Sequence, residues 1–456
     1  MSETRMSETR MSETGRKARL LPRRGVLLLP AVLGGCGIFD DWFGDTKKAL
    51  PGTRLTVMNV RHGLEVDAIG VRVVLPPPVA NPAWPQAGGK PSHAMGHLQL
   101  RDTLDIAWRA DIGEGGGYRA KITAQPVVVG GRVFTMDSDA VVSAFDVATG
   151  GRIWRTETQA EEDRSSNVGG GIAVEGDTLY AGTGRAELLA LEAATGTIRW
   201  RHPVGTPVRA APTIADGRIY VVTMDNQLQA LAANDGRRLW VFQATSPDTG
   251  VLGLPAPAFA DGLVVAGFGA GDLVALRAAS GSVAWSDSLA SARGRNGLSD
   301  LSAVHGLPVL ADGRVYAGGL GGLTISLDAR SGRRLWEREI ATADTPWLAG
   351  DWLFLLGTDG HLAAITRADG RVAWISQLPR FEDDEKKKDP IRWIGPVLAG
   401  GRLLLGSSNA LLVSVNPYNG EVVGQQTLSA AVSVPPVVAG GMAYVVTDDA
   451  TLVALR

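Results

Sequence analysis

Cysteine is almost absent from this chain, which contains one, Cys36, among 456 residues. A single cysteine excludes a disulfide framework within the chain. An excess of charge of one sign is also lacking, because 45 Lys and Arg residues face 47 Asp and Glu residues and the net charge is −2. Because the charges nearly balance, the protein has no strong net electrostatic field, and its composition gives no reason to expect nucleic-acid binding.

Long apolar runs are lacking as well. The run Gly25 to Leu33 (GVLLLPAVL) is too short for a membrane-spanning helix, which needs about 20 apolar residues. Basic residues precede it between Arg16 and Arg24, and this order is typical of a signal peptide. We therefore predict a signal peptide over residues 1–35, in which the polar repeat 1–14 is expected to be disordered.

The segment Leu33 to Cys36 (LGGC) resembles the lipobox of bacterial lipoproteins. That resemblance implies cleavage before Cys36 and its acylation, with palmitate among the acyl groups; a buried cysteine behind an ordinary signal peptide is the alternative. Gly37 follows, where an aspartate would resemble the inner-membrane retention signal. We expect a lipid-anchored protein on the periplasmic face of the outer membrane, with residues 36–83 as the lipidated cysteine and an extended tether.

Glycine is abundant, with 58 residues, and it marks an internal repeat of 38 to 51 residues. Each repeat contains a polar-residue–glycine turn between short Val-rich segments, which is typical of antiparallel hairpins. A tryptophan follows six of the turn glycines by four residues, and the seventh copy has Gly424 instead. The turn glycines are Gly150, Gly196, Gly236, Gly281, Gly332, Gly370 and Gly420, and the tryptophans are Trp154, Trp200, Trp240, Trp285, Trp336 and Trp374.

Four short strands per repeat predict an all-β protein, an eight-bladed β-propeller with four-stranded antiparallel blades over residues 84–456. Eight inner strands can be counted, but the last repeat ends at Thr451 to Arg456 without a fourth strand. Residues 103–110, with Trp108 at the repeat's tryptophan position, provide an outer strand with no blade before it. We predict that this N-terminal strand completes the last blade. The tryptophans are expected to pack between blades.

The pattern from Ala144 to Trp154 (AFDVATGGRIW) resembles the quinoprotein-type repeat. Two families share it: the pyrroloquinoline-quinone dehydrogenases and BamB, a lipoprotein family of the outer-membrane β-barrel assembly machinery. Many such dehydrogenases carry a vicinal disulfide beside the cofactor, and they need a convergent polar set for calcium and the quinone. The propeller segment has no cysteine, and its acidic residues fall in turns. We expect a non-catalytic scaffold without cofactor; the alternative is a quinone-dependent periplasmic dehydrogenase.

The BamB resemblance implies a partner, the periplasmic POTRA domains of the barrel protein BamA, and a role in inserting β-barrel proteins. In the BamB family, a Leu-Arg pair and a nearby acidic loop contact this partner. The Leu-Arg pair is similar to Val208-Arg209, and the acidic loop is similar to Leu298-Ser299-Asp300. Both segments precede an inner strand, so both loops are expected on the same face of the disc. The alternative reading is that Arg209 caps the central channel and Asp300 starts a turn. Unfolded outer-membrane proteins are a further possible partner.

Two other patterns are better explained by structure than by chemistry. His93 and His97 have the spacing of metal ligands on a helix, but PSHAMGHL is typical of a loop and carries no metalloprotease signature. The charge run Phe381 to Pro390 (FEDDEKKKDP) is expected to be a solvated loop.

Overall fold

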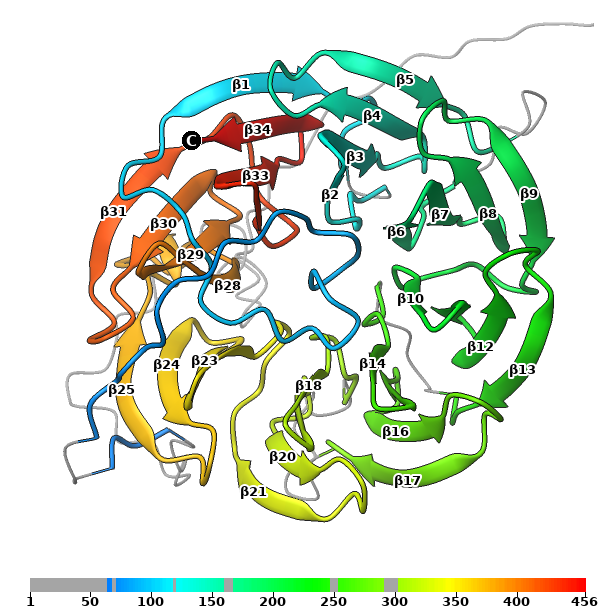
Figure 1. The fold of residues 1–456 in the computed structure, drawn as a ribbon. Helices are drawn as coiled ribbons and strands as arrows, with labels where there is room; N and C mark the ends of the chain where they lie inside the picture. Colours follow the sequence, from blue (N-terminus) through cyan, green and yellow to red (C-terminus); the bar gives the residue numbers. More distant parts are fainter. Residues whose placement is uncertain (1–63, 68–70, 118–119, 160–166, 247–252, 291–301) are drawn as a thin grey trace, which may run out of the picture. The chain divides into compact units, whose positions relative to one another are not determined.

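The computed structural model describes residues 64–67, 71–117, 120–159, 167–246, 253–290 and 302–456. Within these ranges the regular structure is β, and eight four-stranded antiparallel sheets surround a central axis (Figure 1). The prediction of an eight-bladed β-propeller is therefore confirmed. We number the blades from 1 to 8 in the order in which their inner strands occur along the chain.

Each blade from 1 to 7 is built from four consecutive strands that run from the central axis outward. Blades 1 to 4 contain β2 (Val127–Val129), β3 (Arg132–Met136), β4 (Val142–Asp146), β5 (Arg152–Thr156); β6 (Gly171–Glu175), β7 (Thr178–Gly182), β8 (Glu187–Glu192), β9 (Ile198–Pro203); β10 (Thr213–Ala215), β11 (Arg218–Val222), β12 (Gln227–Ala232), β13 (Arg238–Gln243); β14 (Ala258–Ala260), β15 (Leu263–Gly267), β16 (Asp272–Arg277) and β17 (Val283–Ser288). Blades 5 to 7 contain β18 (Val309–Ala311), β19 (Arg314–Gly318), β20 (Thr324–Asp328), β21 (Arg334–Arg338); β22 (Trp347–Ala349), β23 (Trp352–Leu356), β24 (His361–Thr366), β25 (Val372–Gln377); β28 (Trp393–Ala399), β29 (Arg402–Ser407), β30 (Leu411–Val415) and β31 (Val422–Thr427).

Blade 8 is closed by strands from opposite ends of the chain, as predicted. It contains β32 (Val437–Ala439), β33 (Met442–Val446), β34 (Thr451–Leu455) and, as its outer strand, β1 (Ile106–Asp111). Trp108 is paired with Ala454 in this ladder. Asp105 and Arg456 exchange two main-chain hydrogen bonds of 3.0 and 2.8 Å just beyond it. This pairing removes two sheet edges that would otherwise be open.

The core lies between the blades. The second strand of each blade is covered on both sides by neighbouring sheets, and most of its residues are buried and apolar, as in β23 (WLFLL). The outer strands are more exposed, and some of them alternate between exposed and partly covered residues, as in β9. Apolar runs in the middle strands therefore stack the blades, and alternation marks the outer wall of the disc.

The repeat's tryptophan and glycine meet across the boundary between blades. The indole N–H of Trp154 donates to the carbonyl of Ala193 (3.1 Å) in the next blade, and Gly196 of that blade lies against the same indole ring. The other six turn glycines likewise contact the preceding blade's tryptophan. In the structure, the repeat's tryptophans thus lie against turn glycines of the following blade.

Gly424, at the tryptophan position of blade 7, is explained by the closure. The neighbouring blade 8 has no turn between β34 and β1, since these strands come from distant parts of the chain. A tryptophan at 424 would thus have no turn glycine to cover. A Cβ atom at Gly424 would approach only Ser414, at 3.9 Å.

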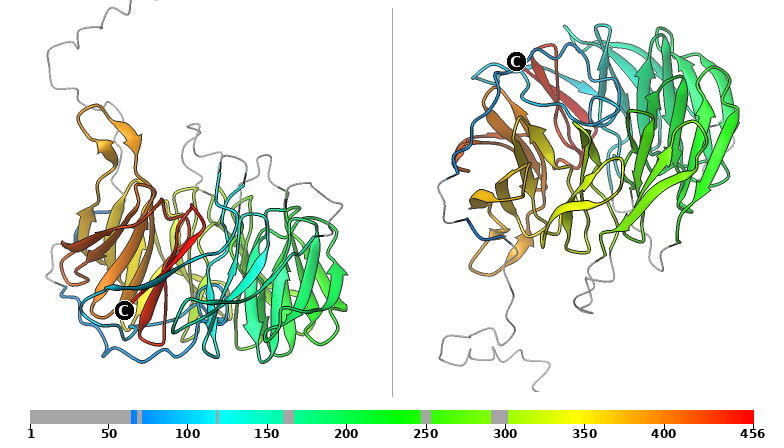
Figure 2. Two further views of the ribbon diagram at one scale, coloured as in Figure 1. Left: turned by 90° about the horizontal axis from the view of Figure 1, so that it is seen from above. Right: turned by 60° about the horizontal axis from the view of Figure 1, so that its bottom comes forward.

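The two faces of the disc carry different connections. Neighbouring strands of a blade run in opposite directions. As a result, the crossovers from an outer strand to the next inner strand lie on the same face as the turns between second and third strands. We call this face the crossover face. The remaining turns emerge on the opposite face. Figure 2 shows the hairpin before blade 7 projecting from one side and the N-terminal described residues crossing the other.

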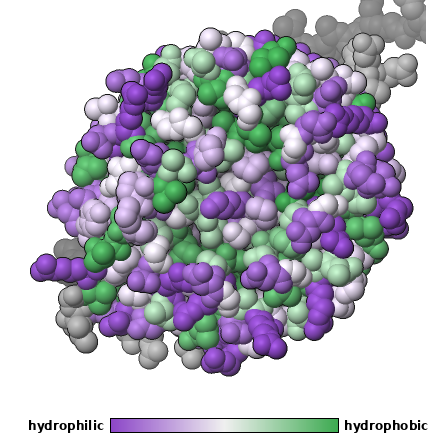
Figure 3. All heavy atoms as spheres, viewed as in Figure 1, coloured by the Kyte–Doolittle hydropathy of each residue, from purple (hydrophilic) through white to green (hydrophobic). Residues whose placement is uncertain are grey.

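Residues 79–100 cross the face opposite the crossover face and are bonded to inner strands around the ring (Figure 1). Asn81 bonds Val438 and Gly440 in blade 8, and Trp84 pairs with Val128 in blade 1. Further bonds join Pro85 to Val174, Gln86 to Ile214, Pro91 to Phe259, Ser92 to Leu310, Gly96 to Trp347 and Leu98 to Leu398. This segment thus contacts all eight blades, and side chains fill the centre of that face (Figure 3).

The described part of the tether predicted for residues 36–83 also contacts the propeller. The Asp67 N–H donates to the carbonyl of Val372 (3.1 Å), and the Val372 N–H donates to the Asp67 carboxylate (2.6 Å). Arg338 lies 3.5 Å from the same carboxylate. Leu64 is partly buried and, like Ile375, packs against the core of blades 5 and 6. Residues 64–67 therefore form a strap along the outer strand of blade 6.

The charge run before blade 7 differs from the loop expected from the sequence. It forms a hairpin of β26 (Phe381–Asp383) and β27 (Lys388–Pro390). Its base is fixed because the Trp393 indole donates to Pro379 (2.8 Å) and Ile391 N–H donates to Arg380 (2.8 Å). The hairpin residues remain mostly exposed, in keeping with their charge.

Candidate partner-binding face

Arg209 lies on the crossover face, in the connection between β9 of blade 2 and β10 of blade 3. Its guanidinium Nη1 donates to the carbonyl of Val168 at 2.7 Å. The side chain is about half-buried, and burial lowers the pKa of Arg209 from its usual value. The group remains cationic at neutral pH, because an arginine is not deprotonated in proteins. Arg209 is therefore a positioned cation with part of its fork open to solvent.

Val208 does not face solvent, which corrects the expectation that it supplies an apolar contact to a partner. Its exposed fraction is 0%, and its side chain packs where a Cβ atom of Gly182 would otherwise lie. Val208 also forms an isolated bridge with Thr223 in the same blade. A valine with this packing fixes the loop that carries Arg209. Valine is shorter than the leucine of the family pattern and fits the tight position beside Gly182. This contact could not be predicted from the sequence of the loop, because Gly182 lies in another blade.

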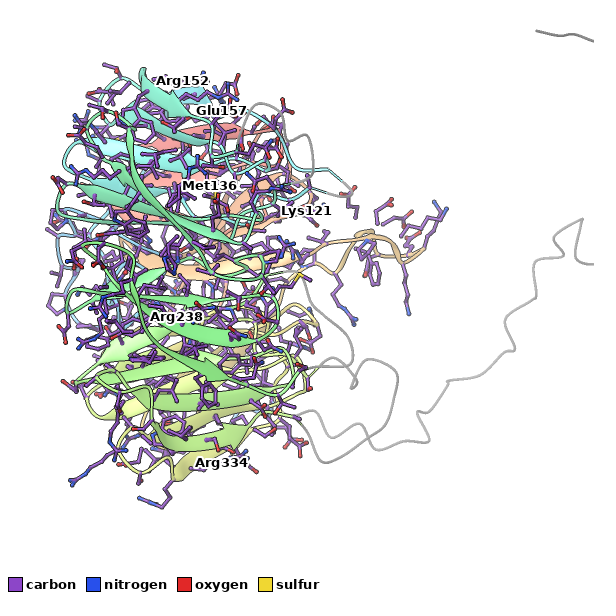
Figure 4. The ribbon with its side chains drawn as sticks, turned by 90° about the vertical axis from the view of Figure 1, so that its right-hand side faces the viewer. Lys121, Met136, Arg152, Glu157, Arg238 and Arg334 are labelled. Atoms are coloured by element: carbon purple, nitrogen blue, oxygen red, sulfur yellow. The ribbon has the colours of Figure 1, made fainter. Side chains whose placement is uncertain are left out.

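The crossovers before blades 3 to 6 contact one another in series. The carbonyl of Arg209 accepts from the Leu254 N–H (2.8 Å) in the next crossover. Gly253 lies beside His305 of the following one, whose Nδ1 is 2.9 Å from the carbonyl of Ala343. Arg209 is thus part of a continuous rim rather than an isolated loop. Lys121, in the crossover before blade 1, lies toward the side from which the hairpin projects (Figure 4).

Leu298, Ser299 and Asp300, the predicted acidic contact, lie outside the described residues. The described end of their crossover is on the crossover face, because Ser302 donates to the carbonyl of Ala270 (2.9 Å) in the turn before β16. Val304 bridges Gly319 in blade 5. Their partner-binding role remains a prediction.

Asp344 is an acidic group of this rim that sequence reasoning did not identify. Its carboxylate accepts from the Gly395 N–H at 3.0 Å. Part of the residue is exposed, but the carboxyl group itself is enclosed, and this burial raises the pKa of Asp344 to about 7; the Gly395 bond and Arg392 oppose the rise. The only local signal is a Thr-x-Asp turn, in which the Asp344 N–H donates to Thr342 Oγ1 (3.1 Å). Such a turn is too common to indicate a site.

His93 and His97 have structural contacts rather than a shared ligand position. Nδ1 of His93 lies 2.7 Å from the carbonyl of Pro308, and burial lowers the pKa of His93 to about 4. His97 is hydrogen-bonded to Pro76 (2.8 Å) and to the Gly401 N–H (3.0 Å). Over the described ranges, no group of three or more His, Cys, Asp or Glu side chains could hold a metal ion.

A calcium-bound quinone does not fit the donor groups that the described residues present. Calcium prefers oxygen ligands such as carboxylates, and these ranges bring together no group of three or more His, Cys, Asp or Glu side chains that could hold a metal ion. At the face crossed by residues 79–100, Trp84 is almost fully buried and stacks on Trp347 with ring centroids 6.5 Å apart.

The predicted membrane anchor, Cys36, lies outside the described residues, as does the predicted signal peptide. In the part of the chain that the structure does describe, no helix has the length and apolar character needed to cross a membrane.

Comparison with known sequences decides between the two families that share this repeat. The family profile described as outer membrane protein assembly factor BamB matches residues 101–167, 138–376 and 380–456. The chain belongs to the BamB family. A BamB from Salmonella typhimurium is 30% identical over 361 residues, covering 77% of this chain and 89% of the relative. The BamB of Yersinia pestis is 28% identical, covering 71% of this chain and 81% of the relative.

Solved structures agree with the fold. The crystal structure of BamB from Moraxella catarrhalis superposes with a TM-score of 0.65 at 20% identity, covering 78% of this chain and 100% of that chain. A quinohemoprotein alcohol dehydrogenase from Comamonas testosteroni reaches a TM-score of 0.63 at 15% identity, covering 82% of this chain and 80% of that one. At these identities both likenesses concern the propeller fold, which BamB proteins and dehydrogenases share.

Proposed function

We propose that this BamB-family protein is a non-catalytic scaffold lipoprotein of the outer-membrane β-barrel assembly machinery. Its crossover face binds the periplasmic POTRA domains of a BamA-type barrel protein, and acylated Cys36 holds the disc at the periplasmic face of the outer membrane. The observation that carries the proposal is the BamB match over most of the chain, with Arg209 held as a half-buried cation on that face.

The mechanism is positioning. A stiff ring of eight blades holds its crossover loops in fixed relative places, and loops on a rigid scaffold are where binding commonly occurs. Arg209 can pair with a partner carboxylate through the part of its guanidinium fork that Val168 does not occupy. The partner's periplasmic arm is then held near the membrane, where β-barrel proteins are inserted.

The test is binding of the soluble propeller to purified POTRA domains, with Arg209→Glu as the variant. The matched control is Arg237→Glu, since Arg237 is an exposed arginine of the same blade on the opposite face. We expect Arg209→Glu to weaken binding about ten-fold or more and Arg237→Glu to leave it unchanged. The proposal for this face would be overturned if Arg209→Glu bound the POTRA domains as tightly as Arg237→Glu does, with both variants keeping the thermal midpoint of the wild type.

A further inference from the structure

Met224 presents an exposed apolar side chain beside the Arg209 loop. It lies in the turn between β11 and β12 of blade 3, on the crossover face, and its exposed fraction is 59%. Its main-chain N–H donates to the carbonyl of Pro207 at 2.8 Å, while the preceding Thr223 bridges Val208. The backbone of Met224 is thus tied to the loop that carries Arg209, and its side chain is open to solvent.

The turn that presents Met224 is held by its own polar groups. The hydroxyls of Thr206 and Thr223 both donate to one carboxylate oxygen of Asp225, each at 2.6 Å. The Asn226 side chain donates to the carbonyl of Thr245 (3.1 Å). These hydrogen bonds hold the backbone of the turn on both sides of Met224.

No other exposed large apolar side chain of the described ranges lies in a turn or crossover of this face. The remaining ones lie on outer strands, in one turn of the opposite face and in the N-terminal segment: Ile153, Leu239, Val241, Val283, Val422 and Val423; Tyr418; and Val66, Val74 and Val79. Single apolar residues on an outer wall need no explanation. Met224 differs because it adjoins a cation already proposed to bind the partner.

We propose that Met224 and Arg209 form one contact surface, in which Met224 enters an apolar depression of the partner and Arg209 pairs with a carboxylate beside it. This inference rests on the proposed function of the crossover face. An unbranched thioether adapts its shape to such a depression, and burying it removes apolar area from water. Met224 thereby supplies the apolar contact that the fully buried Val208 cannot make.

The experiment measures affinity of the soluble propeller for purified POTRA domains with three variants. Met224→Ser removes the apolar contact, and Met224→Leu keeps it with similar volume. Val241→Ser is the matched control, because Val241 is an exposed apolar residue on the outer strand of the same blade, with an exposed fraction of 48%. We expect a loss of about ten-fold for Met224→Ser, less than about three-fold for Met224→Leu, and no change for Val241→Ser.

The outcomes separate this inference from the proposed function. If Arg209→Glu loses binding while Met224→Ser retains it, the role of Met224 is overturned and the crossover face stands. If neither variant loses binding, the face itself is wrong. If Val241→Ser weakens binding as much as Met224→Ser, the effect is not specific to this surface and the inference also fails. Equal thermal midpoints for the Met224 variants show that the ring is intact.

Discussion

Trp374 of blade 6 covers Gly420 of blade 7, and the same indole donates its N–H to the carbonyl of Pro417 at 2.9 Å. A Cβ atom at Gly420 would lie 2.7 Å from a carbon of the indole ring. The glycine is therefore required twice, by its positive φ of +77° and by the tryptophan above it. The second requirement comes from the neighbouring blade, not from the turn.

The first prediction separates these two requirements with a pair of variants. Gly441→Ala imposes the left-handed strain alone, because Gly441 has a φ of +73° and no atom within 4 Å of the added methyl. That strain costs about 1–2 kcal/mol. Gly420→Ala adds overpacking against Trp374, which costs roughly 1–3 kcal/mol more. Urea denaturation measures both free energies of unfolding, and equal losses would show that the indole moves aside without cost.

The second prediction concerns acid stability and His93. The folded state lowers the pKa of this buried imidazole from 6.5 to about 4, so the unfolded chain binds the proton more readily. The stability contributed by neutral His93 is thus present above pH 6.5 and is lost as pH falls towards 4, by about 3 kcal/mol in all. Asp344 acts in the opposite sense, since its pKa is raised from 3.8 to about 7 and its stabilisation grows as pH falls.

Comparison with a variant isolates the histidine from Asp344. His93→Asn suits the position, because asparagine tolerates the φ of +60° and can donate to the Pro308 carbonyl through its amide. We expect the free energy of unfolding of the wild type to decrease relative to that of His93→Asn as pH falls from 6.5 to 4, because Asp344 contributes equally to both proteins. Parallel curves from denaturant titrations at several pH values would contradict this account.

The third prediction concerns the strap, residues 64–67. Asp67→Ala removes the carboxylate that accepts the Val372 N–H, leaving that amide at the outer edge of blade 6. We expect amide exchange at Val372 to become about ten-fold faster or more, with no change at inner strands. Glu65→Ala is the control, because Glu65 is an exposed carboxylate of the same segment. Unaltered exchange at Val372 in Asp67→Ala would show that the strap does not protect this edge in solution.

Much of the architecture could be predicted because the turns of each repeat are determined by residues that are adjacent in the sequence. Thr195-Gly196 marks a hairpin wherever it occurs, and the spacing to Trp200 repeats along the chain, so ring size and strand order follow from counting. The unpaired strand around Trp108 could be assigned to blade 8 by the same counting. The partner of each tryptophan could not be named, since it lies about 40 residues away in the next blade.

The candidate face was harder to predict because its features depend on contacts between distant loops. Val208 and Arg209 are adjacent in sequence, yet the first is buried against Gly182 and the second is half-open. Met224 follows a buried strand and carries no sequence signal of exposure. The course of residues 79–100 over all eight blades is likewise set by one or a few hydrogen bonds to each blade, which leave no periodic pattern in the sequence.

The pairing of β1 with β34 has a kinetic consequence. These strands are about 350 residues apart in the sequence, so the ladder that completes blade 8 has to bring distant parts of the chain together. Contacts of such high sequence separation slow folding, because the entropy of closing the loop is lost before the contacts are gained. Until then the edges of both strands are open to other chains. Pairing of β1 with β34 thus also protects the protein against misassembly through these edges.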